Sequence, residues 1–171
     1  MRRGEALNFL RQDIDWDEGL ITIRKTKFGK SRLIPLHAST VKVLAQYAKR
    51  RDRFFAERHR QPGLHFFVTR TGAGLHATNV NAVFHEASRT IGIRKIGARH
   101  GPRLHDLRHR FAIETLLRWY DDGHPVDCRL PVLSTYLGHV NVTGTYWYLH
   151  STPKLMARIA ERLDRRWKGP R

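Results

Sequence analysis

Three short extended runs lie within the first 36 residues, and patterns with helical spacing fill the rest of the chain. The runs are Asp13–Trp16, Leu20–Arg24 and Ser31–Leu36, joined by the turns Asp17–Gly19 and Lys27–Lys30. Apolar and polar residues alternate in the second and third runs, and both links contain glycine, which is typical of antiparallel strands. We therefore expect a three-stranded antiparallel sheet near the N-terminus of a mainly helical α+β fold.

Helical spacing of apolar residues predicts the remaining elements. A short helix is expected at Arg3–Arg11. Ser39 is expected to cap a helix of about 19 residues, and Thr78 to cap one that ends near Thr90. The apolar run Leu64–Thr69 is expected to be buried. Further helices are expected at Arg103–Trp119, Pro131–Leu137, Thr143–Tyr148 and Pro153–Trp167.

The apolar side chains of these helices indicate which faces are buried. We expect Val80, Val83, Phe84 and Ala87 to point inward, and Leu104, Leu107 and Phe111 to anchor the next helix in the core. On the last helix Leu155, Ile159 and Leu163 form a thin apolar stripe. Nothing in the sequence marks an internal domain boundary.

The charge balance points to a polyanionic partner. Lys and Arg total 32 against 15 Asp and Glu, for a formal net charge of +17 and a pI of about 11.1. An excess of this size causes strong self-repulsion unless an anion neutralises it. Nucleic acid is the leading partner by this criterion, and a merely basic soluble protein is the alternative.

The sequence also argues against several other classes of protein. No apolar run approaches the roughly eighteen residues that a membrane span needs. The N-terminus, Met1–Glu5, lacks the apolar core of a signal peptide, so we expect a soluble, cytoplasmic protein with no membrane partner. Cys128 is the single cysteine, which excludes an internal disulfide and a cysteine-based zinc site.

One expected helix carries a His-x-x-Arg pattern. His105 and Arg108 are three residues apart and therefore point the same way. The guanidinium can offer a bidentate fork to phosphate oxygens, and the imidazole can move a proton near neutral pH. His109 lies four residues after His105, a spacing that could hold zinc, although the glutamate of a metalloprotease helix is missing. The alternative is that both histidines only satisfy hydrogen bonds at the edge of the core.

A second pattern follows near the C-terminus. Leu137-Gly138-His139 ends a helix with glycine, and Tyr148 follows nine residues after the histidine. A phenol has an ordinary pKa near 10, so its attack on phosphate needs help with the proton and a stabilised transition state. Arginine and histidine side chains could supply that stabilisation. Tyr148 on its own could equally be a core residue.

Together these patterns resemble the tyrosine recombinases, also called the phage integrase family, over nearly the whole chain. The family orders its catalytic residues as Arg, Lys, His-x-x-Arg, His or Trp, and Tyr. The first arginine matches Arg2, with Arg3 as the register alternative. The lysine matches Lys27, with Lys30 as its rival. The remaining matches are His105, Arg108, His139 and Tyr148.

The resemblance implies a mechanism. Tyr148 would attack a scissile phosphate and form a 3′-phosphotyrosyl link with a free 5′-hydroxyl. Arg2 and Arg108 would bind the non-bridging oxygens, and His139 would add a hydrogen bond there. Lys27 would protonate the leaving 5′-oxygen, and His105 would assist as the acid–base partner. No metal, nucleotide or other cofactor is implied, and there is no small-molecule substrate.

The resemblance also implies an organisation. Residues 1–171 would form the catalytic domain alone, without the upstream core-binding domain, so we expect either a fragment or a truncated gene product. The partner would be double-stranded DNA, bound by a homo-oligomer, a tetramer. The tail helix 153–171 would dock on a neighbouring protomer or pack on its own domain. Two alternatives are a catalytically silent DNA-binding remnant and a type IB topoisomerase-like nicking-closing enzyme.

Overall fold

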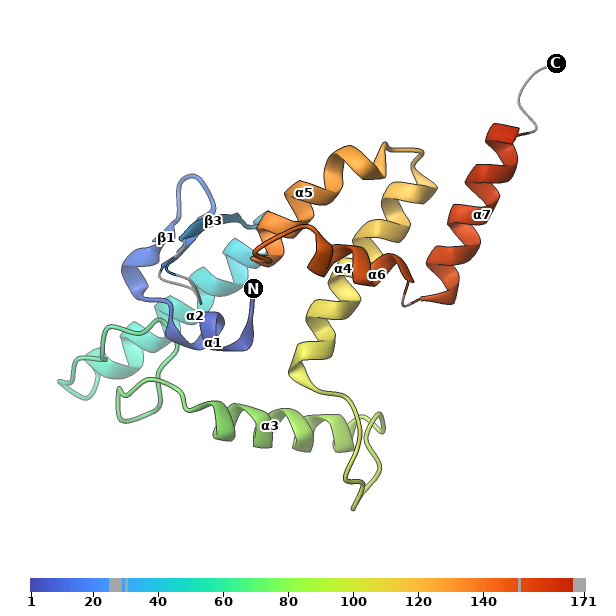
Figure 1. The fold of residues 1–171 in the computed structure, drawn as a ribbon. Coiled ribbons are helices and arrows are strands. Elements are labelled where there is room, and N and C mark those ends of the chain that lie inside the picture. Colours follow the sequence, from blue (N-terminus) through green and yellow to red (C-terminus); the bar gives the residue numbers. More distant parts are fainter. Residues whose placement is uncertain (25–28, 30, 151, 168–171) are drawn as a thin grey trace. The chain divides into compact units, whose positions relative to one another are not determined.

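Each of the three extended runs forms a strand in the computed structural model, which describes residues 1–24, 29, 31–150 and 152–167 (Figure 1). The strands are β1 (Ile14–Asp15), β2 (Leu20–Ile23) and β3 (Arg32–Pro35). They form one antiparallel sheet in the order β1-β2-β3. Ile21 pairs with Ile34 and both are buried, so they lie on the inner face of the sheet. The expected α+β, mainly helical fold is confirmed.

Residue contacts gather into two compact units, 1–103 and 104–171, a division that no sequence feature predicted. The first unit holds the sheet, α1 (Arg3–Asn8), α2 (Ala38–Ala56) and α3 (Ala77–Thr90). Its core is built around Phe66, whose ring packs on those of Phe9 and Tyr47.

Two details of α2 and α3 differ from the expectation. Each helix begins two residues earlier than expected, because a histidine caps it. The Nδ1 atoms of His37 and His76 accept hydrogen bonds from the backbone N–H groups of Ser39 and Thr78. Ser39 and Thr78 were therefore wrongly predicted as caps: they lie inside the first turn.

The inward faces in this unit are also partly different. On α3, Val83 is 65% exposed and Ala87 is exposed, whereas Ser88 is buried and donates to the Phe84 carbonyl at 2.6 Å. A serine hydroxyl that donates to a carbonyl of its own helix can be buried without an unsatisfied polar group. The polarity of a side chain is therefore not enough to predict which face of this helix is buried. In the run from residue 64 to 69, Phe66 is fully buried but Leu64 is exposed.

The described part of the second unit contains the helices α4 (Leu104–Asp121), α5 (Val126–Leu137), α6 (Thr143–His150) and α7 (Pro153–Trp167). They enclose a core of mainly aliphatic side chains. Its buried members are Ala112, Leu116, Val126, Leu130, Leu133, Leu137, Tyr148, Leu149 and Leu155. The last helix has the predicted bounds. Within the described residues, no helix is long and apolar enough to cross a bilayer.

The predicted start of α5 was wrong. The helix begins at Val126, and Pro131 lies inside it. An interior proline costs about 3 kcal/mol. However, Val126 and Leu130 are both buried before the proline, and each fully buried aliphatic side chain contributes about 1.5–3 kcal/mol. Packing therefore outweighs the lost backbone hydrogen bond and extends the helix upstream.

The predicted core face of α4 was also wrong. Leu107 and Phe111 are 56% and 44% exposed, and Phe111 stacks instead on Tyr136 of α5. The buried stripe, spaced by four residues, is Arg108, Ala112 and Leu116. The arginine of the His-x-x-Arg pattern thus lies on the same helix face as core residues.

Candidate active site

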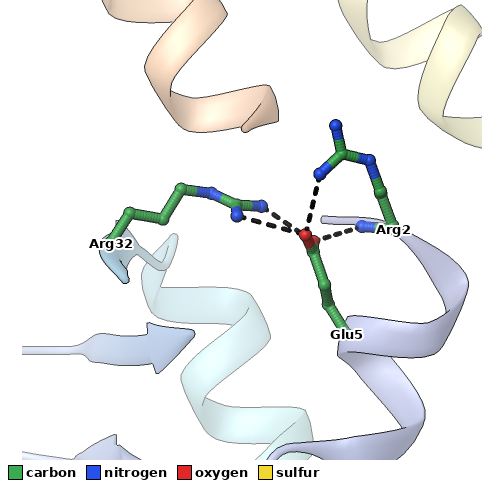
Figure 2. Close-up of polar contacts among 3 residues, drawn as sticks. All are labelled: Arg2, Glu5 and Arg32. Atoms are coloured by element: carbon green, nitrogen blue, oxygen red, sulfur yellow. Dashed lines mark hydrogen bonds and ion pairs between the residues drawn. The ribbon is translucent and has the colours of Figure 1, made fainter. Parts of the chain in front are cut away.

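Arg2 stands at the start of α1 in a network with two other charged side chains (Figure 2). The Glu5 carboxylate accepts hydrogen bonds from the Arg2 backbone N–H at 2.6 Å and from Arg2 Nη1 at 3.2 Å. Arg32, on β3, donates to the same carboxylate through both Nη atoms at 2.7 and 3.1 Å. A bidentate fork of this kind is among the strongest side-chain hydrogen bonds. Glu5 therefore ties the start of α1 to the sheet.

Burial and charge act on Glu5 in opposite directions. Burial would raise the pKa of this carboxyl, but the hydrogen bonds from Arg32 and the Arg2 backbone, with both positive charges, outweigh burial and lower the pKa. The side chains of Glu5 and Arg32 are only 10% and 9% exposed, whereas that of Arg2 is 37% exposed. Arg2 is thus the member of the network that an anion from solution can reach.

The two register alternatives of the first unit have different outcomes. Arg3 donates to the Oδ1 atom of Asn81 on α3 at 3.0 Å, so its guanidinium is directed to a neighbouring helix. Lys27 and its rival Lys30 lie outside the described residues. The choice of Arg2 and Lys27 stays a prediction.

In the second unit, α4 presents three of the relevant side chains. Arg108 is buried, whereas His105 is exposed. The ring of His105 meets the ring of His109 edge-on, with centroids 4.5 Å apart. Because the two histidines are four residues apart on one helix, their side chains stack along the same face.

Tyr148 is carried by α6 and is only 2% exposed. Its hydroxyl lies 3.1 Å from Nδ1 of His109, within hydrogen-bonding distance. The rings of Tyr148 and His139 are nearly parallel, at 15°, with centroids 6.2 Å apart. The phenol that the sequence pointed to thus contacts the imidazole of His109 on α4, and its ring is nearly parallel to that of His139, two residues after the end of α5.

His139 is positioned by the end of α5. Gly138 adopts φ +76°, a left-handed conformation that glycine reaches without strain, and closes the helix. The Nδ1 atom of His139 lies 2.8 Å from the Oγ1 of fully buried Thr145. Gly144 leaves room for the ring, since a Cβ there would lie 3.3 Å from His139 Cγ and Nδ1.

The structure therefore places the predicted residues in two groups. The second unit holds His105, Arg108, His139 and Tyr148, and it brings the last two together with His109. The first unit holds Arg2 in its carboxylate network.

Sequence reasoning missed some supporting residues. Arg32 was assigned only to a strand, and Thr145 and Gly144 only to a turn or short helix. The signal for Glu5 was present in its spacing from Arg2, which is that of a helix capping box. Arg32 lies far along the chain from Glu5, and its contact had no local signal.

The chemistry of this set suits an anionic substrate. It offers guanidinium groups, imidazoles and a phenol. Among the described residues, no group of three or more His, Cys, Asp or Glu side chains could hold a metal ion. Guanidinium and imidazole donors can stabilise charge that develops on phosphate oxygens.

Comparison with known proteins gives a family for this arrangement. The model of the phage integrase family matches residues 1–154. The chain belongs to the phage integrase family. A protein named as an integrase/recombinase from Sinorhizobium fredii is 48% identical over 168 residues, which cover 98% of this chain and 53% of that protein.

Two further members of the comparison are more distant. The tyrosine recombinase XerA of Pyrococcus furiosus is 26% identical over 168 residues, or 96% of this chain and 50% of that protein. The Tn1549 transposon integrase, solved in complex with transposon right end DNA, has the same fold, with a TM-score of 0.62. It is 17% identical, and the match covers 96% of this chain and 55% of that one. This phage integrase family chain spans about half the length of the curated relatives it matches.

Proposed function

We propose that this chain is the catalytic domain of a site-specific DNA recombinase that cleaves and rejoins duplex DNA through a 3′-phosphotyrosyl intermediate. The observation that carries the proposal is the setting of Tyr148. In a phage integrase family chain, the hydroxyl at the expected nucleophile position contacts His109 and the ring lies against His139. The hydroxyl of a buried tyrosine needs one hydrogen-bond partner, and here that partner is an imidazole, which can accept a proton near neutral pH.

In the proposed reaction the two arginines act on the same phosphate. Arg2, accessible at the start of α1, and Arg108 bind the non-bridging oxygens and stabilise the charge of the transition state. His139 donates a third hydrogen bond through Nε2. That role requires Nδ1 to be the acceptor, so the Thr145 hydroxyl must donate to it. Lys27 protonates the leaving 5′-oxygen, and His105 supports proton transfer.

Double-stranded DNA is the proposed partner. The net charge of +17 supports a polyanion, and a structural neighbour is solved in complex with transposon end DNA. Binding that depends on phosphate neutralisation releases counterions, so the affinity should fall steeply with salt. Exchange of strands between two duplexes requires four cleavages, and we propose that a homotetramer on DNA supplies the four tyrosines.

The tail helix is the proposed link between protomers. On α7, Leu155 is fully buried in its own unit, while Met156, Leu163 and Trp167 are exposed. The helix therefore packs on its own unit through one end of its stripe. We propose that the exposed apolar residues dock on a neighbouring protomer.

The test is covalent capture. Duplexes that bind the chain are first selected from a random pool. They are then rebuilt as nicked suicide substrates: the short strand released by cleavage diffuses away, so rejoining is prevented and the covalent intermediate accumulates. The proposal predicts a protein–DNA adduct that survives denaturant. Tyr148→Phe should abolish the adduct with binding unchanged, while Tyr146→Phe, two residues earlier and exposed, should retain it. Binding without any adduct from the unmodified chain would instead indicate a silent DNA-binding remnant.

A further inference from the structure

A histidine outside the six predicted catalytic residues is in contact with the proposed nucleophile. The Nδ1 atom of His109 lies 3.1 Å from the Tyr148 hydroxyl. The two rings pack with centroids 5.5 Å apart, and the exposed Trp147 ring lies 5.6 Å from His109 on another side. The ring of His105 meets the His109 ring edge-on, with centroids 4.5 Å apart. The imidazole of His109 is thus fixed by three aromatic neighbours with one nitrogen toward the phenol oxygen.

This geometry matches a need of the proposed reaction. When the phenol oxygen attacks phosphorus, its proton must leave, and a positioned base typically speeds such a step by about 10²–10⁴-fold. Histidine titrates near neutral pH, and its neutral form has one acceptor nitrogen. The resemblance names His105 as the acid–base partner, and the structure adds a second imidazole, that of His109, within hydrogen-bonding distance of the phenol oxygen.

We propose that His109 is the residue that holds the Tyr148 hydroxyl and accepts its proton. This inference rests on the proposed function. The O–H bond of Tyr148 breaks, and its proton moves to Nδ1 of His109. The phenol oxygen forms the new bond to phosphorus, and the bond to the 5′-oxygen breaks as that oxygen takes a proton from Lys27. In rejoining, the imidazolium returns the proton to the departing phenol.

The other histidines have different placements. The Nδ1 atom of His139 is engaged with Thr145, and its ring lies parallel to the tyrosine ring, which suits a donor to phosphate. The ring of His105 meets that of His109 edge-on, and His105 is exposed. The titratable groups around His109 include His105 on α4 and Tyr148 on α6, and His139 lies near the tyrosine ring.

The experiment compares His109→Gln with His105→Gln on two versions of one selected suicide duplex. One version has an ordinary scissile phosphate. In the other, sulfur replaces the bridging 5′-oxygen. Because a thiolate leaves without being protonated, this duplex restores cleavage to a variant that lacks the leaving-group acid, but not to one that lacks the base for Tyr148. Glutamine keeps hydrogen-bonding capacity but cannot take the proton, and duplex affinity reports whether each variant is folded. Lys27→Ala serves as the reference for an acid defect.

We expect His109→Gln to slow adduct formation by about 100-fold or more on both duplexes, with unchanged affinity. It should also remove the acidic limb of the pH–rate profile, which a merely structural residue would leave in place. Lys27→Ala should be slow only on the ordinary duplex. The inference is overturned if His109→Gln cleaves like the unmodified chain, or if sulfur rescues its defect. If the unmodified chain forms no adduct on either duplex, the proposed function itself falls.

Discussion

Glu5 offers a quantitative test of how the first unit holds Arg2. Glu5→Gln keeps the shape of the side chain but removes the charge that Arg32 and Arg2 share. Hydrogen bonds to charged groups contribute about 1.5–3 kcal/mol, and removal of one partner of a buried pair costs about 3–5 kcal/mol. Because the amide can still accept one hydrogen bond, we expect a loss of about 2–3 kcal/mol at neutral pH.

Native-state hydrogen exchange of peptides from α1 and β3 measures this loss where it occurs. A change of about 2–3 kcal/mol corresponds to exchange that is about 30- to 160-fold faster. Glu18→Gln is the matched control, because it removes the same charge from an exposed position in the β1–β2 turn. It should leave the exchange of these peptides within about twofold of the unmodified chain.

The pH dependence of stability provides a second test of the role of Glu5. Because the folded-state pKa of Glu5 is lowered, its contribution to stability is fully present above the ordinary value of 4.5 and is lost as the pH falls through the lowered value. The difference between the unmodified chain and Glu5→Gln should therefore shrink toward acidic pH. Equal exchange at neutral pH, or a difference that persists unchanged in acid, would refute the reasoning.

Three other predictions concern the second unit and the tail. Thr145→Val removes the hydroxyl beside His139, so adduct formation should fall by about tenfold, or about 1.4 kcal/mol, with little change in affinity for DNA. Gly144→Ala raises helix propensity by about 1 kcal/mol, but the added methyl group crowds the His139 ring. The melting temperature should therefore stay unchanged while the rate of DNA cleavage falls. The double substitution Leu163→Ser and Trp167→Ser should weaken assembly on DNA, measured by sedimentation. It should not affect folding, measured by circular dichroism, because both residues are exposed. Unchanged assembly would refute the docking proposal.

The sequence predicted the fold where one local pattern dominated. The alternation around Ile21 and Ile34 predicted the strands and their antiparallel pairing, and the apolar spacing of the last helix predicted its bounds. It failed where tertiary packing overrode a local signal. Pro131 looks like a helix start, but burial of Val126 and Leu130 extends α5 upstream.

The sequence predicted the residue types of the candidate site, but not the long-range contacts that position them. The sequence predicts the helix that carries His109, but its spacing from His105 suggests only a metal ligand or a histidine at the edge of the core. Its contact with Tyr148 joins residues 39 positions apart, and that of Glu5 with Arg32 joins residues 27 positions apart. Periodicity within one helix carries no information about such pairs. The exposure of Leu107 shows the same limit, since either of two adjacent helix faces could have been the buried one.

Peptide mapping of the trapped adduct tests the central proposal most directly. The selected duplex is labelled at the 5′ end of the cleaved strand, the adduct is digested, and the labelled nucleotide is located by mass spectrometry. We predict that the 5′-labelled strand stays attached, through its 3′-phosphate, to the peptide that contains Tyr148. Attachment to another residue, or retention of the 3′-labelled strand in its place, would contradict the account.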